Sequence, residues 1–246
     1  ASPDVLGFTS GAGLAVIFTV SFGMLISPTV AAVAGGLMAA ALVSAIAYKK
    51  GQETPPVTLI LVGLGVGFLA TAMAAFLMTA LPTSQAMEAQ RWLSGSLSAS
   101  RWDGAALVLL LGTVLTLATL AQSRALDALE LGNDMAKSLG IWTEKSRWMI
   151  SGTGVLLAAV AVSVAGPVPF VALIAGPIGA AITRARSVAG RLISGGLAGA
   201  IVLITADLVA RTAIPNTQLP AGVFTGLIGA PYLLWRLSVE MRKGRV

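Results

Sequence analysis

The two residue types that carry much of enzyme and metal chemistry are missing from this chain of 246 residues, which contains no cysteine and no histidine. Their absence excludes disulfides, thiolate zinc sites, haem ligation by histidine and catalysis by a histidine base, including serine–histidine and HExxH chemistry. The sequence also lacks GxxxxGK[ST], so it offers no P-loop for a nucleotide. We therefore expect this chain to hold no catalytic residue, no metal site and no cofactor.

A first group of charged residues is the pair Asp207 and Arg211, near one end of an apolar segment. Residues four apart share one face of a helix, and an ionisable group inside a membrane span is costly without a partner. The spacing predicts an intramembrane ion pair. It leaves open a second interpretation, in which Arg211 projects from the membrane surface toward an acidic partner.

A second group lies in "ALDALELGNDMAKSLG", residues 125–140, between two long apolar runs. Apolar residues recur there at helical spacing, while the charged residues remain available to water; the former are Leu126, Leu129, Ala136 and Leu139, the latter Asp127, Glu130, Asp134 and Lys137. Gly132 fits the left-handed residue that ends a first helix, and Asn133 or Asp134 can cap a second one. The pattern predicts two short helices with a glycine bend, and a solvated loop is the alternative.

The composition around these groups indicates a membrane protein. Hydrophobic residues make up 56% of the chain and charged residues 11%, whereas a soluble domain carries roughly a quarter charged residues. The charges are clustered and leave apolar runs of about 20 residues, the length of a membrane-spanning helix. We expect an all-helical integral membrane fold.

Eight apolar segments can be distinguished, at roughly 8–26, 28–47, 57–80, 104–121, 148–165, 168–183, 191–210 and 222–237. The sixth is short and contains Pro167, Pro169 and Pro177, so we expect a half-length or broken helix with a break near Pro177. A re-entrant loop is the alternative for this segment. If all eight segments cross the membrane, both ends of the chain lie on the same side.

The basic residues predict which side that is. All of the 16 lysines and arginines except Arg91, Arg101 and Arg211 fall on one side of this arrangement. By the positive-inside rule that side is cytoplasmic, which places both termini in the cytoplasm. The high net charge of +6 is thus explained by topology, and no soluble module with basic residues interleaved with aromatics suggests nucleic acid.

Glycines four apart recur at Gly7–Gly11, Gly63–Gly67, Gly195–Gly199 and Gly222–Gly226. Such spacing lets helix backbones approach closely in lipid, so we interpret these pairs as packing positions. In the connection predicted to lie outside, residues 81–104, Trp92 and Trp102 stand where interfacial anchors belong.

Several stretches together resemble one family, the FecCD/BtuC-like permease subunits of ABC importers for iron–siderophore complexes, haem and vitamin B12. They occur in the family's order and cover essentially the whole chain: "ASPDVLGFTSGAG" (1–13), "RWLSGSL" (91–97), "LELGNDMAKSLGI" (129–141), "AGPVPFVALI" (165–174), "ADLVAR" (206–211) and "QLPAGVFTGLIGAPYLLWRL" (218–237). The resemblance implies a type II importer permease with a fold of ten helices. Since the opening stretch resembles the one that leads into the third helix, we expect the first two helices to be missing here.

The resemblance also implies roles for the two charged groups. Residues 1–246 would form a single transmembrane permease domain, with a cytoplasmic coupling loop of two short helices at 123–146 that docks in a cleft of the ATPase subunit. The matching positions in this coupling loop are Leu131, Gly132, Ala136, Leu139 and Gly140. Arg211 matches an arginine that receives acidic residues of the extracytoplasmic substrate-binding protein.

The implied partners are a pair of cytoplasmic ATPase subunits, which would bind ATP and Mg²⁺, a second permease subunit in a homodimer or heterodimer, the binding protein and membrane lipid. The implied location is the plasma membrane or bacterial inner membrane. The transport path would run between the two permease subunits, with 57–80 and 222–237 as candidate lining segments. An iron–siderophore complex is the expected cargo, with vitamin B12 or haem as alternatives. An ion-coupled secondary transporter is a more distant alternative, because the spans hold almost no ionisable group except Asp207.

Overall fold

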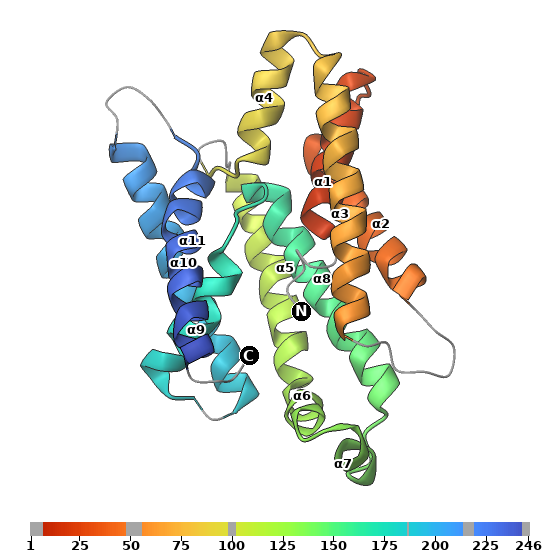
Figure 1. The fold of residues 1–246 in the computed structure, drawn as a ribbon, viewed down its shortest axis with the longest axis vertical. Helices are drawn as coiled ribbons and strands as arrows, with labels where there is room; N and C mark the ends of the chain where they lie inside the picture. The colour runs from red at the N-terminus through yellow and green to blue at the C-terminus, as the bar shows by residue number, and fades with distance from the viewer. Residues whose placement is uncertain (1–6, 48–55, 98–101, 186, 214–218, 243–246) are drawn as a thin grey trace. The chain divides into compact units, whose positions relative to one another are not determined.

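The computed structural model describes residues 7–47, 56–97, 102–185, 187–213 and 219–242, and every regular element within these ranges is a helix (Figure 1). In chain order these elements are α1 (Phe8–Ser21), α2 (Pro28–Ala47), α3 (Pro56–Thr79), α4 (Thr83–Leu93), α5 (Trp102–Ala121), α6 (Ser123–Glu130), α7 (Asn133–Ser138), α8 (Thr143–Ala165), α9 (Val171–Thr183), α10 (Val188–Thr212) and α11 (Ala221–Arg242). The all-helical prediction is confirmed.

Eight of these helices are apolar and correspond to the eight predicted segments. Five are long and apolar enough to cross a membrane, namely those at Pro28–Ala47, Val57–Thr79, Gly104–Ala121, Thr143–Ala165 and Val188–Thr212. Three apolar helices are shorter, at Phe8–Ser21, Val171–Thr183 and Ala221–Trp235. A helix satisfies its backbone groups internally, which is why apolar sequence in lipid takes this form.

The contacts divide the chain into two compact units. The first comprises residues 1–93, 100–116 and 151–167, and the second comprises residues 94–99, 117–150 and 168–246. Helices α5 and α8 each contribute residues to both units.

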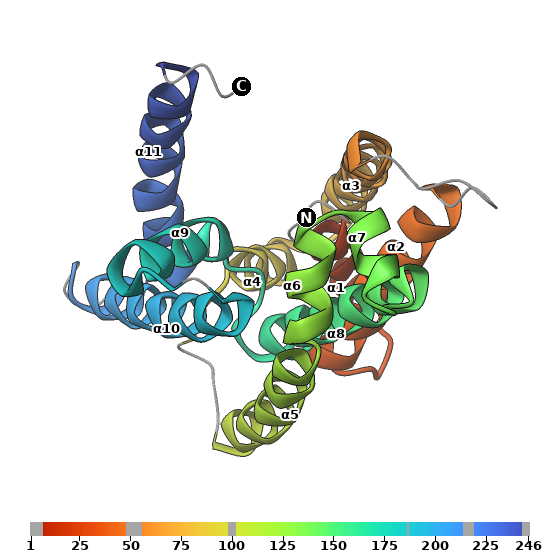
Figure 2. The same ribbon diagram turned by 90° about the horizontal axis from the view of Figure 1, so that it is seen from below.

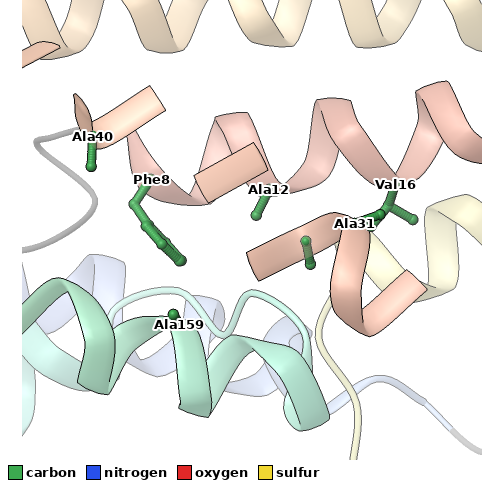
Figure 3. Packing of buried hydrophobic residues seen from close by; sticks show 7 residues of the cluster. Phe8, Ala12, Val16, Ala31, Ala40 and Ala159 are labelled. Atoms are coloured by element: carbon green, nitrogen blue, oxygen red, sulfur yellow. The ribbon is translucent and has the colours of Figure 1, made fainter. Parts of the chain in front are cut away.

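In the first unit, α1 packs against α2 and α3 through small residues. A Cβ atom added at Gly11 would lie 2.7 Å from the carbonyl oxygen of Gly35 on α2, and one at Gly7 would lie 3.3 Å from that of Gly63 on α3. Figure 3 shows the adjacent buried cluster, in which Phe8 and Ala12 of α1 lie near Ala159 of α8. Glycine and alanine let backbones approach closely where side-chain bulk would keep them apart.

Helices α9, α10 and α11 belong to the second unit (Figure 2). A Cβ atom at Gly179 of α9 would lie 2.5 Å from the carbonyl oxygen of Ser194 on α10, and one at Gly199 would lie 3.2 Å from Cβ of Ala175. The packing interpretation therefore holds for Gly195–Gly199. It holds only for the first member of Gly222–Gly226, because Gly226 has open space beside it.

The same unit joins two of the sequence motifs that support the family resemblance. The backbone N–H of Gly222, in the last motif, donates to the carbonyl oxygen of Gly95, in "RWLSGSL", at 3.1 Å. A Cβ atom at Gly222 would collide with the carbonyl oxygen of Ser94. The close approach requires glycine at this position.

The predicted break near Pro177 is wrong. Pro177 lies inside α9, which is half-length as expected but continues from Val171 to Thr183. A proline removes one hydrogen bond from a helix interior, and this helix continues without it. The chain turns before the helix instead, where Gly166 and Phe170 both have positive φ, 67° and 65°.

The connection predicted to lie outside, residues 81–104, holds two features that the sequence pattern did not reveal. It contains α4, an eleven-residue amphipathic helix that the apolar pattern did not reveal. Trp92 of this helix is half-buried and packs against the buried cluster of α1 and α2. Trp102 is 89% exposed.

Candidate functional site

Residues 123–138 of the second unit form a pair of short helices, drawn in green in Figure 1 as α6 and α7. Leu131 and Gly132 connect them, and their backbone N–H groups donate to the carbonyl oxygens of Ala128 and Leu129 at 3.1 and 3.2 Å. These bonds close the end of α6, as the helix C-terminus requires.

Gly132 makes the turn between the two helices. Its φ of 100° and ψ of 160° lie in a region that is essentially restricted to glycine. This differs from the expected left-handed helical conformation, although φ is positive in both. Gly132 is also the N-cap residue of α7, so the prediction that Asn133 or Asp134 takes this position is wrong.

The exposed apolar residues of this element form one row. Leu131, Met135 and Leu139 are four residues apart and are 66, 55 and 59% exposed, and Trp142 follows at 80%. Met135 and Leu139 lie on one face of α7 because they are four residues apart in helical backbone, whereas Leu131 precedes the turn at Gly132 and Trp142 follows Gly140. Met135 and Trp142 escaped the sequence prediction, although the spacing of four residues from Leu139 could have indicated Met135.

Two other predicted coupling residues, Ala136 and Gly140, have structural positions in this element. Ala136 is fully buried, and therefore packs the element internally instead of facing a partner. Gly140 has a positive φ of 78°, and its N–H donates to the carbonyl oxygen of Lys137 at 3.0 Å. Beside it is an open pocket of about 460 Å³, lined by Lys137, Gly140, Ile141, Trp142, Thr143, Glu144 and Lys145.

Two of the four charged residues expected to face water are engaged by α10. Asp127 Oδ1 accepts a 3.0 Å hydrogen bond from the N–H of Val188, and Glu130 Oε2 lies 2.5 Å from Arg191 Nη2. On the other side, Asn133 Oδ1 accepts a 2.7 Å hydrogen bond from Arg147 Nη2 on α8. Sequence reasoning missed these contacts because the residues are 61 and 14 positions apart.

Asp207 and Arg211 lie in the last part of α10, where Arg211 Nε is 2.7 Å from Asp207 Oδ2. The Asp207 side chain is 17% exposed and that of Arg211 is 46% exposed. The cation also lies in the last helical turn, where the helix dipole favours positive charge. Arg211 therefore pairs with Asp207 and remains accessible.

The described parts of the chain bring no three His, Cys, Asp or Glu side chains close enough together to hold a metal ion. The two candidate sites are an exposed apolar row at α6–α7 and an accessible cation at the end of α10. Both suit protein partners rather than a small reactive ligand.

Comparisons with known proteins agree with this description. The model of the FecCD transport family matches residues 1–238. The ferric enterobactin transport system permease protein FepG of Escherichia coli is 34% identical over 248 residues, covering 98% of this chain and 73% of that protein. The cobalamin import system permease protein BtuC of Halobacterium salinarum is 34% identical over 239 residues, covering 96% of this chain and 63% of that protein.

A solved structure has the same fold. It is described as an inward-facing conformation of a metal-chelate type ABC transporter, with a TM-score of 0.85 and 26% sequence identity. The match covers 95% of this chain and 74% of that one.

Proposed function

Since this chain belongs to the FecCD transport family, we propose that it is the membrane-spanning permease subunit of an ATP-driven importer whose cargo is an iron–siderophore complex. The match of the family model to residues 1–238 carries this proposal. The likeness to the enterobactin permease and to a metal-chelate transporter supports an iron chelate as cargo.

The coupling function is assigned to α6 and α7. The exposed row of Leu131, Met135, Leu139 and Trp142 would insert into a cleft of a cytoplasmic ATPase subunit. Burial of apolar side chains stabilises such a contact, and a packed interface switches between discrete arrangements instead of deforming continuously. Nucleotide binding by the ATPase, with its ATP and Mg²⁺, would thus displace α6 and α7 and change the access of the transport path.

The remaining parts of the assembly follow from this assignment. Two permease subunits would enclose the path, with 57–80 and 222–237 as candidate lining segments, and two ATPase subunits would act on them. Arg211, accessible at the end of α10, would receive an acidic residue of the extracytoplasmic binding protein. No step of the reaction requires a catalytic residue or cofactor in this chain, because ATP is hydrolysed by the partner.

Vitamin B12 is the second candidate cargo, because the cobalamin permease matches this chain with the same 34% identity as the enterobactin permease. The fold is shared by both importers, so cargo selection depends on the binding protein and on residues that line the path. Haem is the third candidate, on the family resemblance alone.

An uptake measurement distinguishes these cargoes. The transporter is purified from its native membrane with its ATPase and binding protein and is reconstituted into vesicles. We expect ATP-dependent uptake of a ferric siderophore labelled with radioactive iron, and none with a non-hydrolysable ATP analogue. Preferential uptake of labelled cobalamin or haem would instead favour the corresponding alternative, and uptake driven by an ion gradient without ATP would contradict the importer assignment.

A further inference from the structure

Two side chains of α6 reach the first turn of α10. Asp127 accepts the hydrogen bond from the N–H of Val188, the first residue of α10, at 3.0 Å. Glu130 pairs with Arg191 at 2.5 Å. Because residues three apart lie on the same side of a helix, the two contacts form a ladder between one turn of α6 and one turn of α10.

The first turn of α10 supplies the hydrogen-bond donors that stabilise this contact. The first four N–H groups of a helix have no partner within it. The hydroxyl of Ser187 accepts from the N–H of Gly190 at 3.2 Å, and the carboxylate of Asp127 accepts from that of Val188. A carboxylate at this end is also favoured by the helix dipole. With two charge-assisted contacts, α6 cannot rotate against α10 without breaking at least one of them.

The contacts of Asp127 and Glu130 connect α6 to a helix that is not its neighbour in sequence. The hydrogen bond between Asn133 and Arg147 ties α7 to α8, which follows it directly in sequence. The contacts of Asp127 and Glu130 cross 61 residues. They are therefore suited to carry a displacement of α6 to a helix that lies two elements beyond α8.

We propose that Asp127 and Glu130 are positioning residues that fasten the coupling element to α10, so that α10 moves with α6 and α7 when the ATPase displaces them. This inference rests on the proposed function. Helix α10 is continuous over 25 residues, about 37 Å at 1.5 Å per residue, and Arg211 lies in its last turn. We call the two contacts of Asp127 and Glu130 with α10 the α6–α10 joint. The joint thus connects the ATPase-facing element to the helix whose far end carries Arg211.

The first test separates coupling from assembly. In the full transporter in vesicles, we measure ATPase association, ATP hydrolysis and the amount of substrate moved per ATP. The variant is Asp127→Ala with Glu130→Ala. The matched control is Arg124→Ala, because Arg124 is an exposed residue of the same helix and its side chain forms no hydrogen bond or ion pair with the described residues.

We expect the double variant to retain its ATPase but to move at least about fivefold less substrate per ATP, the scale of typical coupling free energies. The control should remain at the wild-type ratio. If the double variant moves as much substrate per ATP as the wild type, the proposed role of Asp127 and Glu130 is wrong. A wild-type transporter that moves no substrate on ATP overturns the proposed function itself, and the joint with it.

A cross-linking rescue tests the same inference by restoring coupling. Because residues 1–246 contain no cysteine, reagents that react with thiols will modify only the introduced cysteines of this chain. Glu130→Cys and Arg191→Cys are introduced together with Asp127→Ala, so that both contacts are lost. The two cysteines are then bridged by a short bis-maleimide in a transporter whose other subunits are free of cysteine. We expect the unbridged pair to be uncoupled and bridging to restore substrate moved per ATP, while a monofunctional maleimide does not. A ratio that bridging leaves unchanged or lowers further contradicts a joint that moves as one body.

Discussion

At the scale of single residues, Gly132 shows how one backbone conformation determines the shape of a protein contact. Its φ and ψ place it where a side chain is strained, yet an added Cβ atom would have open space around it. The requirement for glycine is thus conformational and not steric. Relief of the strain would reorient α7 and with it the row of Leu131, Met135 and Leu139.

The first prediction replaces this glycine. Gly132→Val should reduce ATP-driven uptake severalfold while the variant permease still inserts into the membrane, because non-glycine residues pay roughly 1–3 kcal/mol in such regions. Uptake of labelled substrate and the amount of membrane-inserted permease are measured together. Gly112→Val is the matched control, since Gly112 also has open space beside it but no positive φ. Unchanged uptake by the Gly132 variant would count against the coupling role of α6 and α7.

A second prediction concerns Arg211. Arg211→Glu should weaken association with the binding protein, and the difference from wild type should be largest at low salt, because ions screen exposed charge pairs. Affinity is measured as a function of ionic strength on the reconstituted transporter. Arg211→Lys retains the positive charge and should lose less affinity than the glutamate variant. Equal affinity of wild type and Arg211→Glu at low salt would remove Arg211 from the docking site.

At the scale of elements, the predictable features are those that depend on local sequence. Apolar runs indicated all eight apolar helices, and the glycine within 125–140 indicated the division into α6 and α7. The features that were missed depend on neighbours distant in sequence. Trp92 packs into the cluster around Phe8, and Asp127 binds the N-terminus of α10. No local pattern distinguishes such a carboxylate from one that faces water.

The contrast between local and non-local features also explains why α9 was predicted only in part. The prolines correctly indicated a helix too short to span the membrane in a regular way, because its 13 residues extend about 20 Å at 1.5 Å per residue. The position of the turn was wrong, because it depends on Gly166 and Phe170, whose positive φ values cannot be read from proline content. Of the predicted coupling residues, Leu131 and Leu139 are exposed, whereas Ala136 is buried.

At the scale of the whole molecule, the arginines and lysines are distributed unevenly along the sequence. All basic residues but Arg91, Arg101 and Arg211 fall on one predicted side. Charged side chains in the hydrocarbon core are costly, and the excess of positive charge sets the orientation during insertion. The coupling role of α6–α7 and the docking role of Arg211 both require this orientation, because the ATPase and the binding protein act on opposite sides of the membrane.

The last prediction tests that requirement directly, and the absence of cysteine again allows single-site labelling. Ser84 of α4 and Ser138 of α7 are both exposed, and each is replaced by cysteine in a separate variant. A membrane-impermeant maleimide should label Ser84→Cys in intact cells and Ser138→Cys only in inverted vesicles, with full labelling of both in denaturant as the control for reactivity. Labelling of Ser138→Cys from outside intact cells would place α7 away from any cytoplasmic ATPase. The apolar row could then not receive force from nucleotide binding, and the proposed coupling would fail whatever the family resemblance.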